Sequence, residues 1–318
     1  MVASIDRGVW PTMVTPYTDD GKIDYPALRG LIEYYVAGGA RGLFAVCQSS
    51  EMYHLSLDER LSLSRACVSI SRGRLPVVAS GHVSDSVIAQ LEEVKRMADT
   101  GVEAVVLVTN RFAAPDESDD VFRRKVESFL TALPDAIRLG FYECPYPYKR
   151  LLTPELMTLI VESGRFEFLK ETSGDLSAIV RKLEIARGSK FKIFNANAAS
   201  LLASLRSGAA GYSGVMANFQ IELYSWLCDR WMALAEEAEA LQDFLGLSSI
   251  VERQFYPVNA LYYLSLEGLA IRLNSRRQNP RDFTESMRRE IEQFRRVSKG
   301  HARRLGLFFP LNERSLEI

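Results

Sequence analysis

Short apolar runs alternate with amphipathic segments along about two thirds of this 318-residue chain. The apolar runs predict eight strands, at residues 9–15, 42–46, 75–80, 104–109, 137–142, 167–170, 191–195 and 210–215. The amphipathic segments predict helices between them, at residues 27–37, 57–70, 85–98, 120–133, 154–162, 176–186 and 198–207. Strands that alternate with helices over short links pair in parallel through right-handed crossovers. Eight such units match the strand count of an α/β (β/α)8 TIM barrel, and an open doubly wound sheet is the alternative.

The pattern changes after residue 215, where long helical segments replace the alternation. We expect helices at residues 220–247, 249–273 and 283–298, and a short strand at residues 305–309. The predicted organisation is therefore a barrel domain at residues 1–225 and a C-terminal helical domain at residues 226–318. Arginines are frequent between residues 272 and 304, and we interpret them as a solvated or subunit-contacting face.

Charge and composition exclude several classes of protein. The net charge of −1 argues against binding to nucleic acid or anionic lipid. No apolar run approaches the roughly 20 residues of a membrane span, and the N-terminal residues lack the apolar core of a signal peptide. We therefore expect a cytoplasmic protein with no membrane partner. The four cysteines and three histidines are scattered, and no nucleotide-binding motif occurs, so neither a metal nor an organic cofactor is predicted.

Lys170 is the first candidate for chemistry, because it follows the apolar run at residues 166–169. Residues 173–175, Ser-Gly-Asp, then supply a turn and a helix cap, so Lys170 should stand at the carboxyl end of a buried strand. Burial disfavours the charged form of a lysine and lowers its pKa from about 10.4. A neutral amine can attack a carbonyl carbon and form a Schiff base. The alternatives are a surface lysine, or half of a buried ion pair with Glu143 or Glu171.

Two further features lie at predicted strand ends. Tyr142 ends the strand before that of Lys170, so its phenol is expected beside the lysine, where it can pass protons. The loop at residues 47–51 reads CQSSE, and its backbone N–H groups and the hydroxyls of Ser49 and Ser50 can hold a carboxylate. Alternatively, Tyr142 is only an aromatic residue at a strand end, and the loop is only a turn that caps a helix.

These features occur together in the order and spacing of a known family. The chain resembles the dihydrodipicolinate synthase and N-acetylneuraminate lyase family of pyruvate-dependent class I aldolases. The resemblance runs from about residue 9 to residue 219, and the helical tail is also similar. The motifs that carry it are PTMVTP at 11–16, FYECP at 141–145, FLKETSGD at 168–175 and GAAGYSGVMANF at 208–219.

The resemblance implies a specific chemistry. Pyruvate, or another 2-keto acid, condenses with Lys170, and Tyr142 relays protons. No metal or organic cofactor is implied, because the imine itself withdraws electrons. Homotetramers, built as dimers of dimers, are usual in the family. The residues implied to bind the keto acid are Gln48, Ser49, Ser50 and Ser213.

The chain departs from the family pattern on the acceptor side. Gln48 replaces a threonine or serine of the carboxylate loop. Phe112 stands where dihydrodipicolinate synthases have a tyrosine lent to a neighbouring subunit, and Pro147 stands where they have an arginine. Residues nearby that can replace the arginine's contact are Arg111, Tyr148, Lys149 and Arg150. We therefore place Arg111 and Phe112 among the predicted substrate contacts and expect an altered acceptor.

The predicted function is a Schiff-base aldolase or lyase that joins or cleaves pyruvate and an unidentified aldehyde or keto acid. The alternatives are a 4-hydroxy-tetrahydrodipicolinate synthase and a dehydratase or aldolase of a 2-keto-3-deoxy sugar acid. A fourth possibility is a keto-acid-binding homologue without catalysis. Intact Lys170 and Tyr142 argue against the fourth, and the replacements at Phe112 and Pro147 argue against the synthase.

Overall fold

The computed structural model describes residues 5–307 of the chain. Its eight strands form one parallel sheet in the order β1-β8-β7-β6-β5-β4-β3-β2. The strands are β1 (Gly8–Val9), β2 (Leu43–Phe44), β3 (Val77–Ser80), β4 (Ala104–Val108), β5 (Leu139–Tyr142), β6 (Phe166–Glu171), β7 (Lys192–Asn195) and β8 (Gly211–Tyr212). From β2 to β8, strands that follow one another in sequence pair with each other, as the alternating pattern predicts, and β1 pairs with β8.

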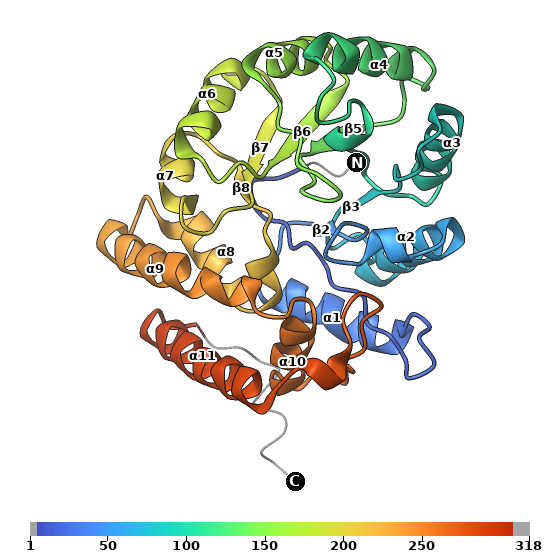
Figure 1. The fold of residues 1–318 in the computed structure, drawn as a ribbon. Helices are drawn as coiled ribbons and strands as arrows, with labels where there is room; N and C mark the ends of the chain where they lie inside the picture. The colour runs from blue at the N-terminus through green and yellow to red at the C-terminus, as the bar shows by residue number, and fades with distance from the viewer. Residues whose placement is uncertain (1–4, 308–318) are drawn as a thin grey trace.

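The sheet closes on itself through the residues that follow β1. Thr12 forms a parallel bridge with Phe44 of β2. The N–H of Met13 donates to the carbonyl of Phe44 at 3.0 Å, and the N–H of Phe44 donates to the carbonyl of Pro11 at 3.0 Å. These bonds join the two ends of the strand order, so the predicted (β/α)8 TIM barrel is confirmed and the open sheet is excluded (Figure 1).

Helices surround the strands in the predicted positions. The cap residues fix where they begin: Ser56 and Glu59 form a capping box at α2, and Asp175 accepts the N–H groups of Ser177 and Ala178 at α6. The helices are α1 (Tyr25–Ala37), α2 (Leu57–Ser71), α3 (Val87–Ala98), α4 (Asp119–Thr131), α5 (Pro154–Glu162), α6 (Leu176–Ala186) and α7 (Leu201–Arg206).

The C-terminal region is helical as predicted, but its helices are shorter. It contains α8 (Ile221–Arg230), α9 (Ala235–Ser248), the 3-10 turn η4 (Ser249–Arg253), α10 (Val258–Leu266) and α11 (Glu285–Arg304). The single helix at 220–247 is wrong because α8 packs on β1 and β8 whereas α9 packs on α7, so the chain turns between them. The single helix at 249–273 is wrong because Pro257 lacks an N–H, and Gly268, with a φ of +92°, follows α10.

Two other predictions concern the two ends of the C-terminal region. The short strand predicted at residues 305–309 does not form at residues 305–307, which follow α11, and residues 308–309 lie outside the described part. The predicted domain boundary after residue 225 falls inside α8, and the division into two domains stays a prediction.

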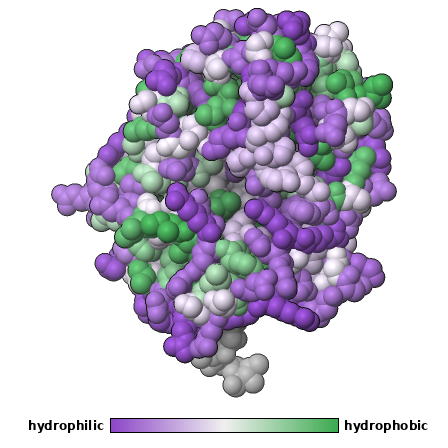
Figure 2. All heavy atoms as spheres, in the orientation of Figure 1, coloured by the Kyte–Doolittle hydropathy of each residue, from purple (hydrophilic) through white to green (hydrophobic). Residues whose placement is uncertain are grey.

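The face of the molecule in Figure 2 is mostly hydrophilic, with hydrophobic side chains in small separate groups. Within residues 5–307, every helix is too short or too polar to cross a lipid bilayer.

Candidate active site

Lys170 and Tyr142 lie side by side at the carboxyl ends of β6 and β5. The two residues are partners in the parallel register of these strands. The Nζ atom of Lys170 lies 4.8 Å from the centre of the Tyr142 ring and 5.9 Å from that of Phe44. The lysine is only 4% exposed. Its amine is therefore enclosed by aromatic rings at the place where the barrel opens to its loops.

Burial changes the acid–base behaviour of Lys170. Desolvation lowers its pKa to about 8, and the weaker influence of nearby Cys47, Cys144 and Glu252 acts in the opposite direction. Within the described part of the chain, Lys170 forms no ion pair. Such an amine is partly neutral near neutral pH and can act as a nucleophile.

The ion-pair alternative for Lys170 is settled by Lys182 of α6. The Nζ atom of Lys182 donates to Oε1 of Glu143 at 2.5 Å and to Oε1 of Glu171 at 2.8 Å. All three side chains are buried. Lys182 thus supplies one cation to the two carboxylates that flank the site, and within residues 5–307 Lys170 has no ion-pair partner.

Tyr142 keeps its proton at neutral pH, because burial raises the pKa of its phenol well above the ordinary value. A hydrogen bond with the side chain of Cys144 also contributes to this rise. Beyond it, Sγ of Cys144 lies 3.6 Å from the hydroxyl of Tyr53, which donates to the carbonyl of Tyr146 at 2.8 Å. The side chains of Cys144 and Tyr53 therefore form a series of polar groups that leads away from Tyr142 within one chain.

The loop at residues 47–51 is a tight turn closed by its own serine. Oγ of Ser50 accepts the N–H of Cys47 at 2.6 Å and donates to the Cys47 carbonyl at 2.8 Å. Ser49 instead donates to Oγ1 of Thr12 at 3.2 Å. Within residues 5–307, the backbone N–H of Gln48 has no hydrogen-bond acceptor, whereas those of Ser49 and Ser50 bond the sulfur of Cys47. The N–H of Gln48 is therefore available to an anion.

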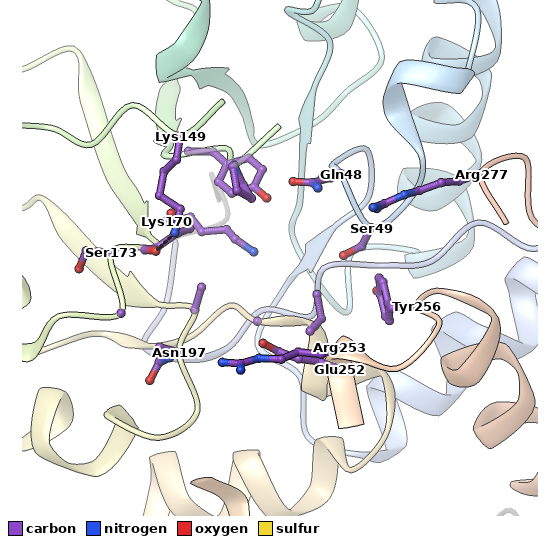
Figure 3. A pocket seen from close by; sticks show the side chains of 17 residues that line it. Gln48, Ser49, Lys149, Lys170, Ser173, Asn197, Glu252, Arg253, Tyr256 and Arg277 are labelled. Atoms are coloured by element: carbon purple, nitrogen blue, oxygen red, sulfur yellow. Dashed lines mark hydrogen bonds between the residues drawn. The ribbon is translucent and has the colours of Figure 1, made fainter. Parts of the chain in front are cut away.

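A cavity of about 490 Å³ opens above the lysine and the tyrosine (Figure 3). Loops after several strands line it, together with residues of the C-terminal region. The lining residues are Gln48, Ser49, Tyr142, Pro145, Lys149, Lys170, Thr172, Ser173, Gly174, Ala196, Asn197, Gly214, Val215, Glu252, Arg253, Tyr256 and Arg277. The volume suits a small organic acid together with a second small molecule.

The other predicted site residues lie around this cavity and do not line it. Ser50 is fully buried behind the loop. Ser213 borders, with Lys170, a small void on the inner side of the lysine. Arg111 pairs with Asp85 at 2.8 Å and lies over the ring of Tyr53.

Phe112 is 2% exposed and belongs to an aromatic cluster between the barrel and its helices. Its ring stacks on His82 at 5.1 Å and meets Phe122, Phe129 and Phe141 edge-on or tilted. Burial lowers the pKa of His82 to about 3, so this histidine is a neutral part of the cluster. Within this chain, Phe112 therefore packs as a core residue away from the cavity.

The residues near Pro147 divide into two groups. Tyr148 donates to the carbonyls of Asn110 and Ala113, and Arg150 pairs with Asp119 at 2.7 Å. The side chains of Tyr148 and Arg150 therefore hold neighbouring loops together. Lys149 lines the cavity, where its Nζ donates to the carbonyl of Thr172 at 2.8 Å.

A sequence model of the dihydrodipicolinate synthetase family matches residues 6–293. The chain belongs to this family. Its members are pyruvate-dependent aldolases, which makes the chain an enzyme of the lyase class.

Relatives within the family are distant. The chain is 28% identical over 250 residues to the 4-hydroxy-tetrahydrodipicolinate synthase of Shewanella piezotolerans, covering 78% of this chain and 83% of that protein. It is 27% identical to the enzyme of the same name from Methanothrix thermoacetophila, with 80% and 86% covered. The fold is similar to that of YagE, a prophage protein of this family from E. coli solved in complex with pyruvate. That likeness has a TM-score of 0.84 at 18% identity and covers 93% of this chain and 99% of the other.

Sequence reasoning missed the cavity residues of the C-terminal region. Glu252 and Arg253 belong to η4, Tyr256 follows it, and Arg277 lies in the loop after α10. Because residues 249–273 were predicted as one helix and no role was predicted for residues 274–282, nothing indicated that this region turns back to the barrel. Pro257 and Gly268 were the available signals for the interruptions.

Metal ligands do not gather in the described part of the chain. No group of three or more His, Cys, Asp and Glu side chains within residues 5–307 has the arrangement of a metal site.

Proposed function

We propose that this enzyme is a class I aldolase or lyase that joins pyruvate, or another 2-keto acid, to a carbonyl acceptor through an imine at Lys170, or cleaves the product. One observation carries the proposal: Lys170 is buried, has a pKa of about 8 and borders the cavity beside Tyr142. Family membership supports it.

The chemistry follows from a neutral amine in that position. The amine of Lys170 adds to the carbonyl carbon of the keto acid, and loss of water, which carries off the carbonyl oxygen, gives an imine that takes up one proton from solvent. Removal of a proton from the adjacent carbon gives an enamine. The enamine carbon then attacks the acceptor's carbonyl carbon, and hydrolysis of the imine releases the product and restores the lysine. Cleavage runs the same steps in reverse.

Tyr142 is proposed to move protons at the imine, and the loop at residues 48–50 to hold the keto-acid carboxylate. The protonated phenol of Tyr142 next to Lys170 supports the first role. The available N–H of Gln48 and the Ser49 hydroxyl support the second. We further propose that protons pass from Tyr142 through Cys144 to Tyr53, since Phe112 has no hydroxyl and lies away from the cavity.

Borohydride reduction tests the central step. Incubation with pyruvate and borohydride should add one reduced pyruvate to the protein, and peptide mapping should place it on Lys170. Lys149 serves as a control, since it lines the same cavity but is exposed and should stay unmodified. The Lys170→Ala protein should not be labelled. Labelling at another lysine, or undiminished labelling of the variant, would refute the proposal.

A second candidate function is 4-hydroxy-tetrahydrodipicolinate synthase, which the names of the two curated relatives favour. Against it stand Phe112, which cannot carry a proton, and Pro147, which cannot pair with a carboxylate. We expect pyruvate trapping without efficient use of aspartate semialdehyde in an assay coupled to the reductase of the pathway. Turnover above about 1 per second would favour the synthase.

A further inference from the structure

Two arginines of the C-terminal region reach the cavity without an ion-pair partner. Figure 3 shows the side chains of Arg253 and Arg277 extending into the space that Lys170 borders. Within the described part of the chain, neither guanidinium group forms an ion pair. By contrast, the neighbouring Arg276 pairs with Glu59 at 2.6 Å. Both side chains are exposed, and the charge of Arg253 acts on the adjacent Glu252, so it is the N–H donors of the two arginines that remain free for a ligand.

The backbone that carries these arginines is anchored. The N–H of Arg276 donates to Oε2 of Glu51 at 2.7 Å, and the Arg276 guanidinium binds Glu59 with two hydrogen bonds. On the other segment, Nδ2 of Asn259 donates to the carbonyl of Val251 at 2.8 Å, which holds η4 in place. Both arginines thus start from fixed positions, which lowers the entropic cost of ordering them around a ligand.

The charges around the cavity do not balance with a keto acid alone. Besides Lys170, the lining has three cations, Lys149, Arg253 and Arg277, and one carboxyl group, Glu252. Burial raises the pKa of Glu252, and the charges of Arg253 and Lys170 act in the opposite direction. Even a fully charged Glu252 and one keto-acid carboxylate leave a positive charge without a partner. A second anion would restore the balance.

We propose that Arg253 and Arg277, which enter the cavity from different sides, favour a carbonyl acceptor that carries an anionic group, a carboxylate or a phosphate. The acceptor would then be an aldehyde or keto acid with an acidic group away from its reacting carbonyl. A guanidinium presents paired N–H donors that match both groups. This inference rests on the proposed function, which assigns the Lys170 end of the cavity to the keto acid.

The test uses probes that differ only in charge. Wild-type protein is first reduced with pyruvate and borohydride, so that the keto-acid end is filled. Succinate and its neutral diamide are then titrated separately by calorimetry at low salt, and inorganic phosphate serves as a third probe. We expect succinate to bind about 10- to 100-fold more tightly than the diamide, the range for hydrogen bonds to charged groups. Tighter binding of phosphate than of succinate would identify the acceptor group as a phosphate.

Variants assign this preference to the two arginines. The Arg253→Gln/Arg277→Gln protein should lose the preference for succinate, whereas Arg253→Lys/Arg277→Lys should keep part of it. Arg289→Gln, on the exposed face of α11, should behave as wild type. Equal binding of succinate and the diamide to wild type, or an unchanged preference in the double Gln variant, would overturn the inference.

The design separates the inference from the proposed function. If pyruvate is not trapped at Lys170, the proposed function fails. The titrations are then run on untreated protein and still report whether the two arginines bind an anion.

Discussion

The low pKa of Lys170 predicts a specific pH dependence of imine formation. A change from the ordinary 10.5 to about 8 raises the neutral fraction of the amine at pH 7 from about 1 in 3,000 to about 1 in 10. Pyruvate should therefore react about 300-fold faster with Lys170 than with an ordinary lysine at this pH. The rate should rise about tenfold per pH unit below pH 8 and level off above it, because only the neutral amine attacks.

The assay measures imine formation at subsaturating pyruvate between pH 6 and pH 10. Samples are quenched at short times with excess borohydride, and the modified Lys170 peptide is quantified by mass spectrometry. Nα-acetyl-lysine under the same conditions supplies the reference curve, with a midpoint near its own pKa of about 10.4. A protein curve that still rises at pH 10, parallel to the reference, would show that burial does not lower the pKa of Lys170.

Three predictions need no knowledge of the acceptor, because they use pyruvate alone. Tyr142→Phe should still be trapped at Lys170 but should exchange the methyl protons of pyruvate with deuterated water about 10²- to 10⁴-fold more slowly, measured by NMR; near-normal exchange would remove Tyr142 from the proton transfer. Tyr53→Phe should slow the same exchange less, while Tyr146→Phe, a matched control that keeps the backbone carbonyl and the ring packed on Tyr53, should not; equal effects of the two would contradict the proton path. Ser49→Ala should raise the pyruvate concentration needed for half-maximal trapping with little change at saturation, as loss of uniform binding does; an unchanged midpoint would mean that its hydroxyl does not contact the carboxylate.

Much of the barrel could be predicted from the sequence because its information is local. Each strand is a short apolar run and each helix an amphipathic one. The pairing of Tyr142 with Lys170 follows from the ends of the two runs, although a bulge between Leu139 and Gly140 shifts the register before them. The closing bridge from Thr12 to Phe44 was not needed for that prediction. The C-terminal region is different, because its periodicity continues through places where the chain turns. In that region, Pro257 is a stronger indication of a helix boundary than the helical periodicity of the residues around it.

The surroundings of Lys170 could not be predicted, because they depend on contacts between distant segments. From the sequence, Glu143 and Glu171 were both possible partners of Lys170. The structure shows that Lys182, which lies on another element, binds both of them. Similarly, no local pattern indicates that Arg253 reaches a cavity formed by the barrel loops. Such contacts are decided by the tertiary fold.

The cluster of Lys182, Glu143 and Glu171 leads to a last prediction, on stability. Glu143 also accepts the N–H groups of Leu152 at 2.8 Å and Thr172 at 3.0 Å, so it joins the ends of the two strands that carry the site. Lys182→Met would leave two buried carboxylates without a cation. Breaking a buried pair in this way costs about 3–5 kcal/mol of the free energy of unfolding.

The loss should depend on pH. Burial already raises the pKa of Glu143 in the folded protein, and removing the ammonium of Lys182 raises it further. The folded state then binds more protons than the unfolded state, so stability falls as pH rises through this range. Denaturant unfolding of Lys182→Met should therefore show a larger loss at pH 8 than at pH 5.5, while Lys125→Met, at an exposed pair with Glu117, should change little at either pH. An equal loss at both pH values would mean that Lys182 stabilises the strand ends by packing, and that its charge does not hold the two carboxylates beside Lys170.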